Sequence, residues 1–169
     1  MGLPAKLKNM NLFNDGASYL GLVPEVTLPK LTRSMEEYRA GGMDMPIKVD
    51  MGGEAMELEW KAGGIIVHAL RQFGATSHDA VMLRFAGAYQ ADDSGQVIPV
   101  EVVVRGRHEE IDMGSAKPGD DTEHTVKTTL SYYKLIVAGR TEIEIDALNM
   151  VFIVNGTDRL LAQRAAIGI

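Results

Sequence analysis

Glu59, Trp60 and Lys61 are the residues of this sequence whose types and spacing come nearest to those of a catalytic site. Side chains two positions apart on a strand share a face, so Glu59 and Lys61 would point the same way. With an upstream carboxylate such as Asp44 or Asp50, this arrangement fits a metal-dependent nuclease, in which carboxylates hold Mg²⁺ and the lysine orients the attacking water. The same spacing follows from any strand with a solvated outer face, so a purely structural interpretation fits equally.

The histidines and the remaining acidic cluster predict no metal centre. His68, His78, His108 and His124 are spread along the chain, and none belongs to an HExxH pair. Residues 120–124, with the sequence DDTEH, lack the alternating carboxylates and final glutamate of an EF-hand loop. Glycine-rich nucleotide loops and a GxSxG nucleophile motif are missing as well. We therefore expect no catalytic residue, no metal site and no cofactor.

Length and composition exclude further classes of protein. A chain of 169 residues is typical of one domain, here 1–169, with enough buried surface for a hydrophobic core. Without cysteine, disulfide scaffolds and cysteine zinc sites are impossible. The 23 acidic against 17 basic side chains, a formal net charge of −6, argue against a protein that grips nucleic acid through a basic face. No targeting segment or membrane anchor is expected, so the chain should fold in a cytoplasm.

The elements that must position these residues are predicted to be strands, because the dominant hydrophobic period is two. In residues 56–61, Met56, Leu58 and Trp60 alternate strictly with charged residues. The same alternation puts Val126 and Tyr132 on one buried face. We expect half-exposed antiparallel strands joined as two long hairpins, residues 81–90 with 96–109 and residues 125–137 with 141–154.

Helices and irregular segments complete the prediction. Residues 64–73 place an apolar stripe at helical spacing, and Gly74 would end that helix. A weaker helical turn begins at Thr157 or Asp158. Residues 28–50 and 112–124 read as long irregular segments, which are uncommon in a compact domain unless they serve a function or a partner.

Several blocks, taken in order, resemble one known family. They are residues 3–16 (LPAKLKNMNLFNDG), 26–33 (VTLPKLTR), 84–90 (RFAGAYQ), 104–107 (VRGR), 110–112 (EID), 145–150 (IDALNM) and 155–159 (NGTDR). Together they are similar to the major tail tube protein of contractile-tailed bacteriophages and of the related R-type bacteriocins. The resemblance runs from residue 3 to the end of the chain.

This resemblance implies a non-enzymatic structural subunit with a mainly β, antiparallel β-sandwich or barrel-like domain, one flanking helix and long loops used in assembly. Members form sixfold rings of self-associated subunits that stack into a hollow tube inside a contractile sheath. Implied partners are the tail sheath, tape-measure, baseplate and tail terminator proteins, with DNA only in transit through the lumen. The implied location is the virion tail, assembled in the bacterial host cytoplasm. A type VI secretion-like tube protein and, from Glu59 and Lys61, a metal-dependent nuclease remain alternatives.

Two sets of residues are predicted to serve such a tube. The solvated strand face is expected to line an acidic lumen that repels phosphate, with the set Glu101, Lys127, Thr129, Ser131, Glu142, Glu144 and Asp146. The segment 28–50 is expected to stack one ring on the next, through the set Leu31, Arg33, Met35, Tyr38, Met43 and Met45. The helix at 64–73 is expected to pack outside the sheet, on the sheath side.

Overall fold

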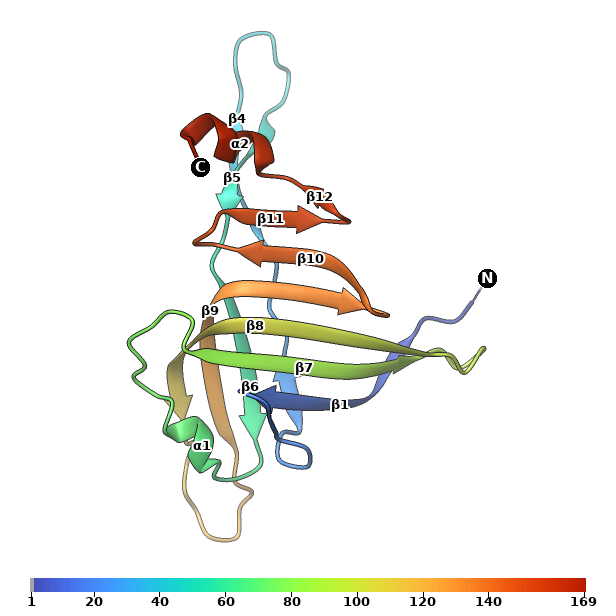
Figure 1. The fold of residues 1–169 in the computed structure, drawn as a ribbon, viewed down its shortest axis with the longest axis vertical. Coiled ribbons are helices and arrows are strands. Elements are labelled where there is room, and N and C mark those ends of the chain that lie inside the picture. The colour runs from blue at the N-terminus through green and yellow to red at the C-terminus, as the bar shows by residue number, and fades with distance from the viewer. Residues whose placement is uncertain (1) are drawn as a thin grey trace.

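The computed structural model describes residues 2–169 (Figure 1). Within them, alternating apolar and polar residues give mainly antiparallel strands, which confirms the expected fold class. The elements in chain order are β1 (Lys6–Asn14), β2 (Ala17–Ser18), β3 (Glu25–Thr27), β4 (Arg33–Tyr38), β5 (Ile47–Gly53), β6 (Met56–Ala62), α1 (Val67–Leu70), β7 (Val81–Gln90), β8 (Val97–Asp112), β9 (His124–Val137), β10 (Arg140–Asp146), β11 (Val151–Val154), β12 (Thr157–Asp158) and α2 (Leu161–Ile167).

One large sheet and one separate hairpin make up the β structure. The sheet has ten strands in the order β12-β11-β10-β9-β8-β7-β1-β2, with β6 paired to β9 and β3 paired to β6. Strands β4 and β5 pair only with each other. Their hairpin runs along the long axis of the molecule and projects beyond the large sheet (Figure 1).

Strand β9 belongs to both layers of the fold. Its first half pairs with β6, up to Met56 opposite Leu130, and its second half pairs with β10, from Tyr132 opposite Asp146. In Figure 1, β7, β8 and the second half of β9 cross in front of β6, so the sheet folds back on itself. The core lies between the two layers, where the completely buried side chains include Leu12, Leu58, Trp60, Leu83, Phe85 and Val104.

A β-bulge lies where β8 and β9 change partner. Arg105 is opposite Tyr132 and Gly106 is opposite Leu130, so Ser131 is the additional residue on β9. The two strands approach so closely that a β-carbon on Gly106 would overlap the backbone carbonyl of Thr129. Glycine is therefore the residue that allows this approach.

The bulge reverses the faces of the second half of β9. Tyr133 is only 5% exposed and packs in the core, while Tyr132 lies on the opposite face and donates a hydrogen bond to Glu144 Oε2 at 2.8 Å. The prediction that Tyr132 shares the buried face of Val126 is wrong. The additional residue moves every later side chain of β9 to the opposite face of the sheet. The alternation of residue types within β9 does not show where such a residue lies.

Several predicted boundaries also differ from the structure. The strand predicted at 141–154 is two strands, because residues 147–150 form a turn that ends with Met150 at a φ of 53°. The helix predicted at 64–73 is reduced to α1, which is followed by single turns with hydrogen bonds from Gln72 N to Ala69 O and from Phe73 N to Leu70 O. Only Ile66 and Ala69 of its apolar stripe are buried. No capping side chain stabilises its start, so little holds a longer helix.

Other segments have more regular structure than expected. The segment 28–50, predicted to be irregular, contains β4 and most of the hairpin to β5. At the C-terminal end, Thr157 and Asp158 pair with β11, and the helix begins at Leu161 instead. Strand β1 is an element that the sequence pattern did not predict. Its first four residues are all exposed, and its buried side chains, Leu12 and Asn14, come only at its end.

A buried polar network attaches the segment after α1 to the sheet. His108, which is 5% exposed, contacts Thr128 Oγ1 through Nδ1 at 2.9 Å and Gln72 Oε1 through Nε2 at 2.9 Å. Gln72 Nε2 in turn donates to Asn14 Oδ1 at 2.8 Å. The uncharged imidazole satisfies both contacts, and burial lowers the pKa of His108 to about 4.

We predict that Gly106→Ala destabilises the subunit by more than about 3 kcal/mol, because the added methyl group must displace a backbone carbonyl. Urea unfolding of the soluble variant measures this. The matched control is Gly41→Ala, where a β-carbon meets no atom within 4 Å. Equal unfolding midpoints for the two variants would contradict the prediction.

We also predict a pH dependence that originates in His108. Since the folded imidazole has a pKa of about 4 and an exposed one titrates near 6.5, the unfolded chain takes up the proton first. Stability present above pH 6.5 is therefore lost as the pH falls towards 4, by on the order of 3 kcal/mol. The urea midpoint of His108→Gln should fall less over this range than that of the wild type. Parallel pH profiles would exclude His108 as the source.

Candidate assembly surfaces

The residues of the nuclease alternative do not meet in the structure. Lys61 Nζ pairs with Glu123 at 3.3 Å and Glu25 at 3.6 Å, and these carboxylates raise its pKa. Asp50 lies on the β4–β5 hairpin, where Arg33 holds it and lowers its pKa. Within residues 2–169 no group of three acidic or histidine side chains is placed to hold a metal ion. The geometry therefore gives the nuclease interpretation no support.

The histidines make structural contacts. His68 Nδ1 contacts the hydroxyl of Tyr19 at 2.8 Å, and His78 Nδ1 contacts Ser131 Oγ at 2.9 Å. His124 is buried at the start of β9. Across the described part of the chain, no helix is both long and apolar enough to span a membrane.

Among residues 2–169, no helix or strand lies over one face of the large sheet (Figure 1). Register places on this face the residues that alternate with the buried Leu83, Phe85, Val102 and Val104. The charged members of its central part are Arg84, Glu101, Arg105, Lys134, Glu144 and Asp146. We call this surface the open sheet face.

Each cation at the centre of the open sheet face lies against a carboxylate or an aromatic ring. Arg84 Nη1 bonds Glu101 Oε1 at 2.6 Å, and Lys134 Nζ lies 3.9 Å from Glu144 Oε2. The guanidinium of Arg105 lies 5.4 Å from the ring centroid of Tyr132. Burial, together with the bond to Glu144, raises the pKa of Tyr132 to about 12. The acidic and basic groups therefore balance in the central part of this face.

The predicted lumen set is divided between two surfaces. Glu101, Glu144 and Asp146 lie on the open sheet face. Lys127 and Thr129 lie beyond the bulge, opposite Glu59 and Glu57 of β6, and Lys127 Nζ pairs with Glu57 at 3.2 Å.

The other two members of the set are at irregularities. Ser131 is the bulge residue of β9, and Glu142 lies at the register shift of β10. Arg84 and Arg105 alternate in the sequence with the buried Leu83 and Val104, so the period-two pattern is enough to indicate their face. Lys134 lies after the bulge, where the same pattern gives no such signal. The bulge therefore determines which residues of β9 lie on the open sheet face.

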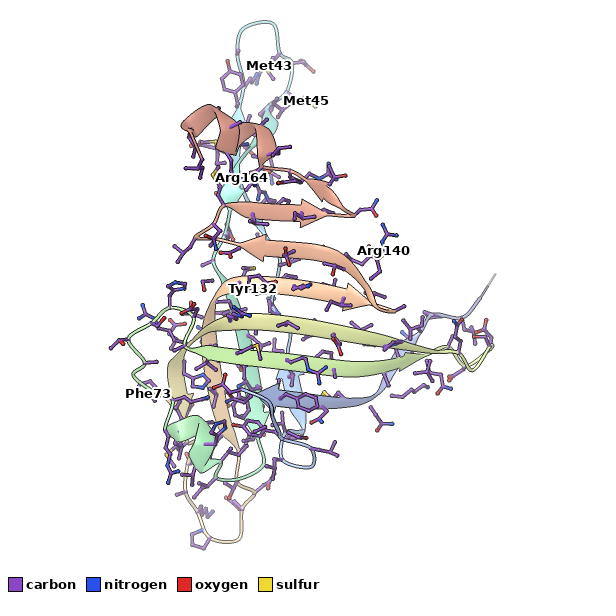
Figure 2. All side chains as sticks on the ribbon, viewed as in Figure 1. Met43, Met45, Phe73, Tyr132, Arg140 and Arg164 are labelled. Atoms are coloured by element: carbon purple, nitrogen blue, oxygen red, sulfur yellow. The ribbon has the colours of Figure 1, made fainter. Side chains whose placement is uncertain are left out.

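The β4–β5 hairpin exposes apolar side chains. Met35, Tyr38 and Met45 are 51%, 56% and 68% exposed. Strand β5 adds three more that the sequence interpretation missed, Ile47, Val49 and Met51. In Figure 2, Met43 and Met45 lie at the far end of the hairpin, away from the sheet. An exposed apolar element of this kind is typical of a protein interface.

Arg33 fixes the base of the hairpin. Its Nε and Nη2 donate to the two carboxylate oxygens of Asp50 at 2.9 and 3.0 Å, and its guanidinium lies 5.1 Å from the ring centroid of Phe152 on β11. Such a bidentate, stacked arginine fixes orientation as well as distance. Leu31 and Arg33 of the predicted stacking set are therefore at the hairpin base, while Met35, Tyr38, Met43 and Met45 lie along its shaft and tip.

The amino-acid sequence matches known proteins along almost its whole length. Residues 4–168 match the family model of the phage tail tube protein FII. The chain is 46% identical over 172 residues to the tail tube protein of Escherichia phage P2, with 100% of both chains covered. It is 39% identical over 154 residues to the major tail tube protein of Serratia phage KSP20, covering 90% of this chain and 88% of that protein.

Solved structures share the fold at low sequence identity. The TM-score is 0.56 with a chain from the PVC sheath/tube terminator of an extracellular contractile injection system, at 9% identity over 76% of this chain and 92% of the other. It is 0.52 with a chain from the 6-fold symmetrised baseplate of the anti-feeding prophage, at 10% identity over 76% and 91%. The architecture is therefore shared well beyond recognisable sequence similarity.

We predict that Arg33→Ala loosens the hairpin without unfolding the sheet. Because the bidentate bond and the stacking on Phe152 are both lost, amide hydrogen exchange in β4 and β5 should become several-fold faster while exchange in β7 to β9 stays unchanged. Lys48→Ala is the control. Lys48 is an exposed cation on the same hairpin, and it makes no ion pair with the described residues. Faster exchange in the control as well would contradict a specific role for Arg33.

Proposed function

The chain belongs to the phage tail tube protein FII family, as its sequence resemblance indicated, and from this we propose that it forms the inner tube of a contractile tail as stacked sixfold rings. The observation that carries the proposal is a sheet whose two ends are both incompletely paired. At one end, β2 covers only Phe13 and Asn14, which leaves most of the outer edge of β1 open. At the other end, β12 covers only Ile153 and Val154 of β11.

Unpaired edges support lateral assembly. Backbone groups on an open edge pair readily with a strand from another chain. If β1 of one subunit joins the β11–β12 end of the next, the contact is heterologous, and a rotation that closes gives a ring. The ten-stranded sheets then become one continuous sheet, and a closed sheet has no exposed edge.

In such a ring, the open sheet face is the surface we propose for the lumen. Its cations are already bound by carboxylates or, for Arg105, by an aromatic ring, as in the pair Arg84–Glu101. Paired cations offer little to DNA phosphates, so DNA in transit would pass without binding tightly. The acidic lumen expected from the net charge of −6 stays a prediction for the assembled ring. The centre of the open sheet face adds no excess acid to it, because the acidic and basic groups there balance.

The β4–β5 hairpin is the element we propose for stacking rings. It projects beyond the sheet and carries apolar groups that its own chain leaves uncovered (Figure 1). Burying them against the adjacent ring would remove that apolar surface from water. Stacking in one direction only generates an open-ended tube, whose length must be set by another protein such as a tape measure.

Sheath, baseplate and tail terminator proteins are the further proposed partners, in a virion tail assembled in the host cytoplasm. The shared fold with chains from a sheath/tube terminator and a baseplate supports this part of the proposal. The side of α1 is proposed to face the sheath. The subunit acts without catalysis, and DNA passes through the tube after the sheath contracts. A type VI secretion-like tube shares the fold and the ring, and genes for sheath and tape-measure proteins beside this one would favour a phage-like tail.

Negative-stain microscopy of the purified chain tests the proposal. We predict hollow polymers or sixfold rings for the wild type. A variant in which Asn-Gly replaces residues 39–46 keeps Tyr38 and Ile47 paired but lacks the tip, and it should form rings without stacks. A wild-type chain that stays monomeric at high concentration would overturn the tube assignment, and stacked tubes of the shortened variant would overturn the role of the hairpin.

A further inference from the structure

An apolar cavity lies at the base of the hairpin. Its volume is about 480 Å³, and it opens to solvent. It is lined by Leu31 just before β4, by Arg33 at the start of β4, and by Ile143, Phe152 and Leu160 from the last part of the chain. Most of its lining is aliphatic or aromatic. Open apolar cavities of this kind favour an apolar occupant over water.

An adjoining groove carries an available cation. The groove shares Arg33, Phe152 and Leu160 with the cavity and continues to Arg159 and Gln163. Arg159 is exposed, and its guanidinium makes no hydrogen bond or ion pair with the described residues. Its backbone N–H donates to Phe152 O at 2.7 Å, which fixes the residue at the rim. By contrast, Arg164 on α2 is fully engaged with Asp158 and with the carbonyl of Met150.

The hairpin tip has the complementary chemistry. Met45 is 68% exposed, and the adjacent Asp44 is exposed without an ion pair in the described chain. The tip is already ordered, because Arg39 Nε donates to Met43 O at 3.1 Å and Met43 N donates to Ala40 O at 3.2 Å. A flexible methionine next to a carboxylate suits an apolar cavity with an arginine at its rim.

We propose that the hairpin tip of one subunit inserts into this cavity of a second copy, with Met45 in the apolar part and Asp44 paired to Arg159. Tip and cavity are at opposite ends of the same hairpin, so the contact joins two copies. A contact between two different surfaces is heterologous and propagates in one direction. The inference rests on the proposed stacking role and specifies the receiving surface.

A charge swap tests the pair. Asp44→Arg and Arg159→Asp should each raise the protein concentration needed for tube formation by about tenfold or more, since each puts like charges together. The double variant Asp44→Arg/Arg159→Asp should return this concentration to near the wild-type value, as measured by sedimentation. The matched control is Glu36→Arg/Arg159→Asp, which changes charge on the hairpin shaft and should not restore assembly.

Disulfide cross-linking locates the contact directly, because the chain has no cysteine of its own. Met45→Cys combined with Ala147→Cys, on the cavity lining, should give a ladder of linked subunits on a non-reducing gel after oxidation of assembled tubes. The control places the second cysteine at the exposed Arg71 and should give no ladder.

These outcomes separate the inference from the proposed function. Tubes that form without a Met45–Ala147 ladder and without rescue by the double charge swap would overturn the cavity as the receiving site while the tube assignment stands. The same result is expected if a sheath subunit or the C-terminal segment of a neighbour covers the cavity. Failure of the wild type to form any polymer would overturn the tube assignment itself.

Discussion

The close approach of β8 and β9 at Gly106 is the constraint on which the rest of the structure depends. Because that position has no side chain, the carbonyl of Thr129 can come close, and β9 can leave one layer and enter the other. The first half of β9 then pairs with β6 and the second with β10, which encloses the core between them. A sheet folded in this way buries one face of β7, β8 and β9 and leaves the other without cover among the described residues.

The uncovered face and the incompletely paired ends follow from the same topology. A sheet that folds back on itself through its middle strands still ends at β1 on one side and β11 on the other, each covered by a two-residue strand. An isolated chain with such edges would tend to associate. In the tube proposed above, ring closure would satisfy those edges, and stacking through the hairpin would cover the apolar side chains that the subunit leaves exposed. The features that look incomplete in the subunit are therefore the ones that a tube requires.

The ion pairs on the open sheet face are consistent with the proposed lumen. The net charge of −6 suggested an acidic surface, yet the centre of the open sheet face pairs Arg84 with Glu101 and Lys134 with Glu144. Pairing keeps cations away from phosphate without requiring an excess of acid at the same place. Arg33 and Arg164 are likewise engaged with carboxylates of their own chain, whereas Arg159 is left available at the rim of the cavity.

The sequence by itself determined the strands with a strict period of two, such as Met56–Leu58–Trp60, because burial of one face imposes that period locally. It also determined the family, through ordered blocks along the whole chain. Only the tertiary structure decided which solvated residues share a surface, because the additional residue Ser131 reverses the faces of β9 and moves Tyr133 into the core. It also decided that Arg33 anchors the hairpin, since its partners Asp50 and Phe152 are distant in sequence and meet only when β5 and β11 are in place. Such contacts depend on pairing between distant segments, which local periodicity does not encode.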